Sequence, residues 1–212
     1  VGKLRKIFSL KSIIKDIPYD RASTSMAAFT QCAPCRREYD DPLDRRFHAQ
    51  PNACTDCGPH LSFFVGGKPE QGDAIALAVE TIRAGGIVAV KGLGGFHLAC
   101  DAQNEQATSL LRRRKQRYEK PFAVMARDLK SIRAFCEVSA EEEALLTGFR
   151  KPIVLLRKKP ETALAPSVAP GNARLGVMLP YTPLHCLLME LFSALVMTSG
   201  NVSDRPMIYK DE

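Results

Sequence analysis

The sequence predicts a mixed α/β domain preceded by a small four-cysteine metal-binding module. From about residue 73 onward, apolar runs typical of buried strands alternate with amphipathic helical segments. Near the N-terminus, two Cys-x-x-Cys pairs stand close together. With 212 residues, 45% of them hydrophobic, the chain is long enough for one sizeable domain and a small one.

Charge and cysteine usage indicate the kind of partner and the cellular compartment of the protein. A net charge of +7, from 30 Lys and Arg against 23 Asp and Glu, suits partners that carry phosphate without distinguishing nucleotides from nucleic acid. No run approaches the roughly 18 apolar residues of a membrane span, and the basic start VGKLRKIFSL does not read as a signal peptide. Seven cysteines, three of them scattered, fit a reducing compartment. We therefore expect a cytoplasmic protein with no membrane partner.

The two cysteine pairs are predicted to bind zinc. They lie in the stretch CAPCRREYDDPLDRRFHAQPNACTDCGP, with eighteen mostly charged and turn-forming residues between them, a spacing found in four-cysteine zinc ribbons. The predicted ligands are Cys32, Cys35, Cys54 and Cys57. Four thiolates leave no open coordination position, so the metal is expected to be structural and His48 a surface or packing residue. A redox dithiol would need a strand and a helix around one pair, and neither pair shows that context.

The first elements of the larger domain are a helix, a strand and a second helix. Residues 73–84 carry an apolar helical stripe that Gly85 and Gly86 can stop. GIVAVKG (86–92) reads as a buried strand that ends in the loop LGGFHLACDA (93–102), and residues 104–117 read as a helix that turns strongly basic at its end.

The later elements continue the alternation. Asp128 can cap a helix over 128–136, and Ser139 with Glu142 forms a capping box for a helix that Gly148 stops. Thr182 and Pro183 can begin a helix over 182–192. The remaining strand candidates are PFAVMA (121–126), KPIVLLRK (151–158), RLGVML (174–179) and SALVMTSG (193–200).

Four stretches near strand ends could form a binding site. They are KGLGGFHLAC, RRRKQRYEKPF, VMTSGNVS and MLPYTPLH, which offer glycines, cations, small polar residues and a proline-stiffened helix entry. Each could equally be a plain turn or a solvated basic face. Residues two apart do not share a helix face, so Lys115 and Arg117 can meet one ligand only if the helix ends there and the chain turns.

In order and spacing, these stretches and the cysteine pairs resemble the HypF family, the carbamoyltransferases of nickel–iron hydrogenase maturation. The resemblance covers nearly the whole chain. It implies the tail of a first, incomplete zinc-finger module in residues 1–30, a four-cysteine finger in 31–66 and a YrdC-like domain in 67–212 whose C-terminal end is truncated. The expected fold of that domain is a twisted sheet with flanking helices.

The resemblance also implies an activity. A YrdC-like domain in this family joins carbamate, derived from carbamoyl phosphate, to Mg-ATP as carbamoyl-adenylate, and another domain passes the carbamoyl group to the HypE protein. The family signature Lys-x-Arg and Ser-x-Asn matches Lys115, Arg117, Ser199 and Asn201. By resemblance Lys115 and Arg117 are catalytic, and the nucleotide and acyl-adenylate are bound by Lys91, Gly94, Gly95, Lys120, Tyr181, Thr182, Thr198, Ser199 and Asn201. Tyr118, where a Pro is expected, and Arg205, where an acidic residue is expected, depart from the family pattern.

The chemistry of the remaining candidates is also constrained. Attack of a carbamate oxygen on the α-phosphate needs positioning and positive charge rather than a side-chain nucleophile, so His97 is not needed as a base. His97 is left open between a pocket and a core position, while His185 is expected in the core. The three scattered cysteines, Cys100, Cys136 and Cys186, are expected to be buried small hydrophobes.

Two other functions stay open. A zinc module and a positive balance would suit a regulatory protein that binds double-stranded RNA, although Asp40, Asp41 and Asp44 in the spacer would repel phosphate. Threonylcarbamoyl-AMP synthesis would use the same Lys-x-Arg and Ser-x-Asn residues. The finger and the GLGGFHLAC stretch favour HypF.

Overall fold

The chain divides into two compact units, Val1–Ser62 and Phe63–Glu212, and each is described by itself. The structure is a computed structural model that describes residues 14–201 and 206–208. Arg205 and most of the last residues of the chain lie outside this range, as do the first thirteen residues of the segment interpreted as the tail of a first finger. Within the described residues, none of the helices has the length and apolarity that a membrane crossing requires.

The smaller unit contains short helical segments around the four cysteines. Two 3-10 turns, η2 (Arg21–Ser23) and η3 (Ser25–Ala28), precede α1 (Ala33–Asp40). The sequence interpretation of the spacer as charged and turn-forming missed α1, which begins directly after Cys32 with a proline in its first turn, a position that proline favours.

The guanidinium of Arg21 links separate segments of this unit by hydrogen bonds. Arg21 donates from Nη1 to the carbonyl oxygens of Gln50 and Asn52, at 2.6 and 2.9 Å, and from Nη2 to that of Phe29. The phenol of Tyr39, which is buried, donates to Gln50 Oε1 at 2.8 Å. Hydrogen bonds therefore make up much of the interior contact of this unit.

The larger unit begins with a hairpin that the sequence analysis did not identify. Strands β1 (Phe63–Val65) and β2 (Lys68–Glu70) pair antiparallel around Gly66 and Gly67, whose φ angles are 58° and 80°. Positive φ at both central residues is the condition for the type I′ turns that close two-residue hairpins.

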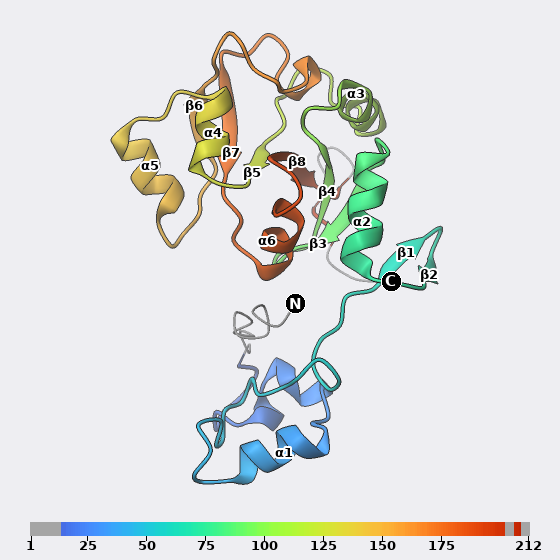
Figure 1. Cartoon of the computed structure of the whole chain (residues 1–212), viewed down its shortest axis with the longest axis vertical. Coiled ribbons are helices and arrows are strands. Elements are labelled where there is room, and N and C mark those ends of the chain that lie inside the picture. The colour runs from blue at the N-terminus through green and yellow to red at the C-terminus, as the bar shows by residue number, and fades with distance from the viewer. Residues whose placement is uncertain (1–13, 202–205, 209–212) are drawn as a thin grey trace. The chain divides into compact units, whose positions relative to one another are not determined.

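A six-stranded sheet forms the centre of the larger unit (Figure 1), in the order β3-β4-β8-β5-β7-β6. All neighbouring pairs are antiparallel except β5 with β7. The strands are β3 (Val88–Lys91), β4 (Phe96–Asp101), β5 (Val124–Ala126), β6 (Val154–Arg157), β7 (Arg174–Met178) and β8 (Ala194–Ser199). The mixed α/β fold and the twisted sheet with flanking helices are confirmed.

The prediction of a loop over residues 93–102 is wrong, because β4 occupies most of it. Gly92 donates its N–H to the Gly95 carbonyl at 2.8 Å, which reverses the chain within four residues and lays β4 against β3. Gly95 has a φ of 142°, and a Cβ there would lie 2.6 Å from the carbonyl oxygen of Ile208. The glycines that suggested an extended loop instead form a tight turn between two paired strands.

The helices begin where local capping predicts. They are α2 (Ala74–Arg83), α3 (Glu105–Arg114), α4 (Leu129–Phe135), α5 (Ala140–Thr147) and α6 (Pro183–Met189), together with the 3-10 turn η4 (Pro166–Val168). Asp128 and Thr182 cap α4 and α6, and Ser139 with Glu142 forms the expected capping box at α5. Gly85, with a φ of 83°, follows the end of α2. These helix predictions are confirmed.

Two apolar layers pack on opposite faces of the sheet. Helices α2 and α6 lie side by side over one face (Figure 1) and contribute, among others, Ile82 and Leu188. Helices α3, α4 and α5 contribute Leu111, Ile132 and Leu146 to the other. Alternate residues of the central strands enter the two layers, as the period of two along a strand requires.

The layer of α2 and α6 does not extend over the outermost strand, β6. Residues of β6 alternate between buried and exposed, and Leu156 is fully buried while Leu155 is 61% exposed. Ile153, just before the strand, is also exposed. The sheet thus presents an open apolar strip along β6.

One of the three scattered cysteines departs from expectation. Cys100 and Cys136 are buried as predicted, but Cys186 is exposed. Consecutive residues of an α-helix point about 100° apart, and in α6 the fully buried residue is His185. The apolar neighbours of Cys186 in the sequence therefore face the core while its own side chain does not.

Candidate functional site

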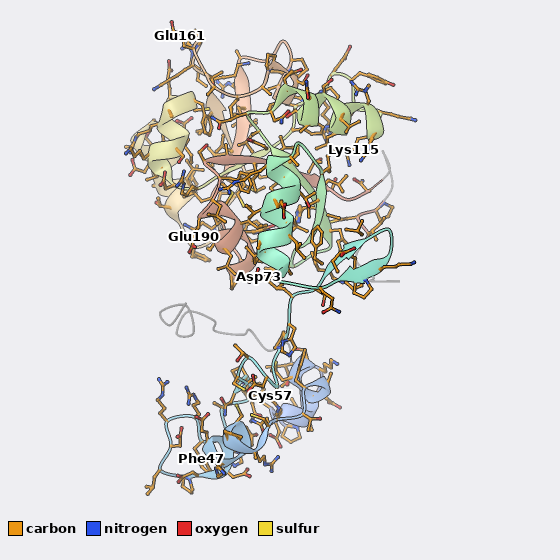
Figure 2. The ribbon with its side chains drawn as sticks, turned by 45° about the vertical axis from the view of Figure 1, so that its right-hand side comes forward. Phe47, Cys57, Asp73, Lys115, Glu161 and Glu190 are labelled. Carbon is orange, nitrogen blue, oxygen red and sulfur yellow. The ribbon has the colours of Figure 1, made fainter. Side chains whose placement is uncertain are left out.

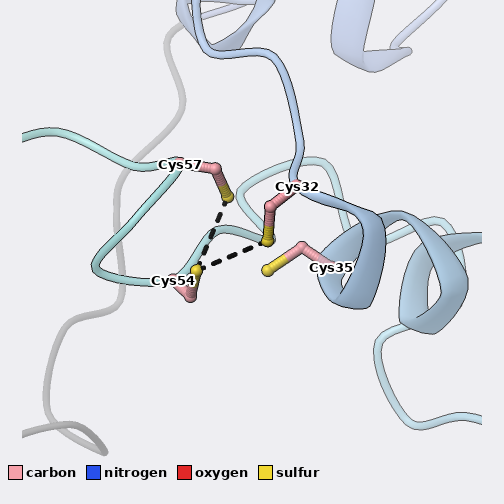
Figure 3. Close-up of side chains that lie close together, drawn as sticks. All are labelled: Cys32, Cys35, Cys54 and Cys57. Atoms are coloured by element: carbon pink, nitrogen blue, oxygen red, sulfur yellow. Dashed lines mark hydrogen bonds between the residues drawn. The ribbon is translucent and has the colours of Figure 1, made fainter.

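The four predicted zinc ligands converge in the smaller unit (Figure 3). The sulfur atoms of Cys32, Cys35, Cys54 and Cys57 all lie within 4.8 Å of one another. Cys54 Sγ is 3.6 Å from Cys32 Sγ and 3.8 Å from Cys57 Sγ. Tetrahedral zinc with Zn–S bonds of about 2.3 Å requires S···S separations of about 3.8 Å, so the thiol set fits such an ion. His48 lies outside the cluster, stacked on Tyr39 with ring centroids 5.1 Å apart.

In the larger unit, the end of α3 brings the Lys-x-Arg pair together. The helix ends at Arg114, Lys115 is its C-cap, and Gln116 adopts a left-handed φ of 50°. This is the turn that convergence of Lys115 and Arg117 on one site requires. Figure 2 labels Lys115 at this end of α3.

Lys115 joins the end of α3 to the end of β8. Its Nζ donates to the Ser199 carbonyl at 2.6 Å, to the Asn201 carbonyl at 3.0 Å and to Asn201 Oδ1 at 3.1 Å. Ser199 Oγ donates to the same Asn201 Oδ1 at 2.6 Å. Burial, and then the positive charge of Arg117, hold the pKa of Lys115 below its ordinary value. Lys115, Ser199 and Asn201 thus form one cluster.

Arg117 lies beside this cluster on a short irregular loop. Its guanidinium donates to the carbonyl oxygens of Lys120 and Pro121 and reaches Thr198 Oγ1 at 3.5 Å. The guanidinium carbon also lies 5.2 Å from the ring centroid of Phe122. Burial lowers the pKa of Arg117. Backbone acceptors therefore fix the guanidinium at the end of β8.

A cavity of about 490 Å³ opens next to these residues. The apolar residues of its lining lie in or next to the strands, and its cationic residues, Arg117, Arg150 and Lys151, are called its rim below. It is lined by His97, Arg117, Ala123, Arg150, Lys151, Ile153, Met178, Tyr181, Met197, Thr198, Ser199 and Met207. Four of the residues predicted by resemblance, Arg117, Tyr181, Thr198 and Ser199, belong to this lining.

Two cations of the lining were missed by the sequence analysis. Arg150 and Lys151 follow α5 and precede β6. Lys151 has a φ of 44°, which is sparsely populated for a residue with a side chain, and it precedes Pro152. Lys151 Nζ donates to the Thr147 carbonyl at 3.1 Å, near the C-terminus of α5. Their place on the rim follows from tertiary packing, and no local motif indicated it.

The other predicted site residues, Lys115 and Asn201 included, are not part of the cavity lining. Lys91, at the end of β3, is exposed, with its Nζ 5.0 Å from the ring centroid of Phe96. Gly94 is exposed, and Gly95 is buried against Ile208. The Lys120 side chain is exposed, and the Thr182 hydroxyl caps α6 by accepting from the His185 N–H at 3.1 Å.

Two histidines and a tyrosine connect the cavity to the core. His97 lines the cavity, and its Nδ1 is buried without a partner among the described residues. His185 is fully buried, its two ring nitrogens also lack partners there, and its ring centroid is 6.1 Å from that of His97 and 4.5 Å from that of Tyr181. Burial, and then the charge of His97, lower the pKa of His185 to about 4. His185 is a core residue as predicted, and His97 is a pocket residue.

Comparisons with known proteins agree with this division of the chain. The HypF finger family matches residues 32–64, and the Sua5/YciO/YrdC family, described as "Telomere recombination", matches residues 80–212. Carbamoyltransferase HypF of Rhodobacter capsulatus is 55% identical over 198 residues, which cover 93% of this chain and 26% of that protein. Threonylcarbamoyl-AMP synthase of Mus musculus is 31% identical over 135 residues, covering 63% of this chain and 48% of that protein.

Solved structures show the same relation. A full-length HypF in a phosphate- and nucleotide-bound form matches with a TM-score of 0.84 and 56% identity, covering 94% of this chain and 26% of that one. P. abyssi Sua5 complexed with L-threonine matches with a TM-score of 0.57 and 22% identity, over 66% of this chain and 42% of that one, a likeness of fold. The chain spans about a quarter of the length of the HypF relatives it matches. It belongs to the Sua5/YciO/YrdC family and joins a YrdC-like domain of that family to a HypF finger, as the HypF carbamoyltransferases do.

Proposed function

We propose that the YrdC-like domain, taken as residues 67–212, binds ATP at the cavity beside Lys115 and forms carbamoyl-adenylate from carbamate. The observation that carries this proposal is the cluster of Lys115, Ser199 and Asn201, with Arg117 held beside it near Thr198. Arg117, Thr198 and Ser199 also line a cavity whose lining includes two further cations. Arg117, Arg150 and Lys151 give this rim the charge that a triphosphate needs. The nucleotide recorded in the full-length HypF structure supports the same ligand class.

The reaction needs no side-chain nucleophile. A carboxylate oxygen of carbamate forms a bond to the α-phosphorus while the bond to the oxygen bridging the α- and β-phosphates breaks, and pyrophosphate leaves with that electron pair. Lys115 and Arg117 stabilise the negative charge that develops on the phosphoryl oxygens, and Ser199 and Asn201 hold the ammonium in place. Magnesium enters with ATP as part of the substrate and would neutralise phosphate charge. Lys91, Gly94, Gly95, Lys120, Tyr181, Thr182 and Thr198 are proposed to complete the nucleotide site.

The finger, taken as residues 31–66, is proposed to hold a structural zinc through its four cysteines. The mutual distances of the sulfur atoms and the HypF finger match support this assignment. By relation to HypF, we further propose that carbamate originates from carbamoyl phosphate and that HypE receives the carbamoyl group through parts of the relatives that this chain does not span. None of the seven cysteines forms a disulfide, which supports a cytoplasmic, reducing location.

Binding of double-stranded RNA is the weaker candidate. The basic run at the end of α3 offers such binding little, because Arg112 in that run is buried and donates to carbonyl groups within the protein. Only its neighbours Arg113 and Arg114 are exposed there. A surface for phosphate recognition needs its cations at the surface.

Calorimetric titration of the chain with Mg-ATP tests the binding site. A Lys115→Ala, Arg117→Ala double variant is expected to weaken binding by ~100-fold or more, because charge-assisted hydrogen bonds contribute roughly 1.5–3 kcal/mol each. The matched control is Arg113→Ala, Arg114→Ala, which removes the same charge from exposed positions of the same helix. Equal losses in both double variants would contradict the site.

Exchange of labelled pyrophosphate into ATP tests the chemistry. The exchange is expected with ammonium carbamate and not without it. Exchange that needs L-threonine and bicarbonate instead would reassign the chain to threonylcarbamoyl-AMP synthesis. Salt-dependent binding of duplex RNA, without binding of ATP, would replace the proposal by the RNA-binding alternative.

A further inference from the structure

We propose that Arg112 is a positioning residue that fixes the loop carrying Arg117 by tying it to the 3-10 turn η4. This inference rests on the proposed function, because Arg117 matters through its place at the nucleotide site. Nothing in the Lys-x-Arg signature distinguishes Arg112 from its exposed neighbours Arg113 and Arg114.

The guanidinium of Arg112 donates in two directions. On one side Nε and Nη2 donate to the Ser167 carbonyl, at 3.0 and 2.7 Å, and Nη2 also reaches the Val168 carbonyl at 3.3 Å. On the other side Nη1 donates to the carbonyls of the loop, those of Arg117, Tyr118 and Lys120. One planar side chain thereby joins two segments some fifty residues apart in the chain.

The loop depends on these bonds because it has no regular structure of its own. It follows the C-terminus of α3, where backbone carbonyls lack helical partners. Arg117 N–H donates to the Arg112 carbonyl at 3.1 Å, and the Lys120 carbonyl accepts from the side chains of both Arg112 and Arg117. The guanidinium groups of Arg112 and Arg117 therefore share the Lys120 carbonyl as an acceptor.

The opposite anchor is itself fixed from the other end of α3. Glu105, seven residues before Arg112 and so on the same helix face, accepts from the N–H of Ser167 at 3.0 Å and from its hydroxyl. Phe122 N–H donates to the Val168 carbonyl at 2.9 Å, and the Phe122 ring lies 4.6 Å from the Arg112 guanidinium carbon. Two side chains of α3, Glu105 and Arg112, thus hydrogen-bond to η4. Arg112 also hydrogen-bonds to the loop and so connects it to this anchored turn.

Lysine cannot replace this arrangement. An ammonium is a compact charge with three donors, whereas the guanidinium fork donates to separated acceptors in one plane. Arg112→Lys keeps the charge and removes the geometry, and Arg113→Lys is the matched control because Arg113 is exposed on the same turn.

The first measurement is the affinity for Mg-ATP. Arg112→Lys is expected to weaken binding by about 10-fold, while Arg113→Lys leaves it unchanged. In an Arg117→Ala background, Arg112→Lys is expected to cause less than a further 2-fold loss, since its effect passes through Arg117. A purely structural role would give the same fold-change in both backgrounds, and that result would overturn the proposal, as would an unchanged affinity in Arg112→Lys.

Hydrogen exchange without nucleotide keeps the inference separate from the proposed function. Faster exchange in Arg112→Lys is expected at the amides of residues 117–120, 122, 167 and 168, with the strand amides unchanged. This result supports the clamp even if no nucleotide binds, and unchanged exchange in these segments overturns it. Should Arg112→Lys not fold, Glu105→Gln loosens the same anchor from the other end of α3. Faster exchange over 117–122 is then expected, and its absence likewise overturns the clamp.

Discussion

The two units of this chain stabilise their folds differently. The larger unit buries apolar side chains on both faces of a six-stranded sheet. Among the described residues of the smaller unit, only Met26, Cys35 and Tyr39 are buried hydrophobics, and Cys35 belongs to the thiol cluster. Thr24, Gln50 and Asn52 are buried beside them. A unit of this size with so small a core needs a cross-link or a metal, whereas the larger unit does not.

Loss of the metal site should produce the largest difference in stability between the two units. Cys35→Ser, or chelation of the proposed zinc, is expected to unfold residues from about 30 to 62 completely while the sheet domain stays folded, because metal binding supplies the folding free energy of such modules. Two-dimensional NMR spectra would show the collapse of one set of resonances only. Cys186→Ser, at an exposed cysteine of the other unit, is the control and should change neither set.

Freshly purified protein also offers a direct check. One zinc per chain is expected by metal analysis. A folded finger without any bound metal would contradict the inference that the smaller unit depends on a metal for its stability.

A cavity in the sheet core should have the converse effect. Leu195, fully buried in the central strand β8, contributes to the layer under α2 and α6. Leu195→Ala is expected to lower the free energy of unfolding of the larger unit by about 2–5 kcal/mol and to leave the finger unaffected. Denaturant titration measures this loss, and Leu191→Ala, at a position 48% exposed, should cost far less. A similar loss in both variants would argue against the assigned core.

Acid should weaken the larger unit through His185. Burial, and secondarily the charge of His97, lower the pKa of this ring to about 4 in the folded unit, against about 6.5 in the unfolded chain. Between these values the unfolded chain binds a proton that the folded unit does not. The stabilisation is therefore complete above about pH 6.5 and is lost as the pH falls toward 4, by on the order of 3 kcal/mol.

Thermal unfolding across this pH range checks the assignment. His185→Phe is expected to flatten the profile between pH 6.5 and 4, since the apolar ring cannot take up a proton. His60→Phe, at an exposed position of the smaller unit, should leave the slope of the larger unit unchanged. An unchanged slope in the first variant would remove His185 as its source.

The smallest expected effect is local to one helix end. Asp73 caps α2 by accepting from the N–H groups of Ile75 and Ala76, at 2.8 and 2.9 Å. Asp73→Ala is expected to destabilise the larger unit by about 1 kcal/mol. Glu80→Ala, at an exposed position later in α2, is the control and should remain within about 0.5 kcal/mol of the parent. Chemical denaturation resolves the two, and equal midpoints would contradict the cap.

Features set by neighbouring residues could be predicted from the sequence. The caps at Asp128, Ser139 and Thr182 act within one helical turn, and the four clustered cysteines lie in two four-residue motifs. Strand β4 was missed because its glycine turn looks locally like a loop, and only its pairing with β3 and β8 distinguishes it. The signal for the β1–β2 hairpin, two glycines between short apolar and polar runs, was present and was not used.

The lining of the cavity could be predicted from the sequence only in part. The family signature could be matched to Lys115, Arg117, Ser199 and Asn201, but Arg150 and Lys151 reach the rim only because β6 packs beside β7. The buried state of Arg112 depends on η4, far along the chain. Position in the basic run gave no sign that one arginine points inward and its neighbours outward.

The open strip along β6 has a consequence for self-association. The C-terminal end of its outer edge is covered, because Cys136 bridges to Lys158 and the Glu137 N–H donates to the Arg157 carbonyl. Toward the other end, Ile153 and Leu155 are exposed, and an open strand edge with aliphatic residues is a template for pairing with another chain. Lys151 before the strand and Arg157 at its end flank the apolar residues with positive charge. Charges so placed act as gatekeepers, because stacking two copies of this edge would bring like charges together. The two cations that border the apolar strip would thus oppose pairing of separate copies through this edge, although Glu137, whose carboxylate is 3.9 Å from the Arg157 guanidinium, offsets part of the charge at one end.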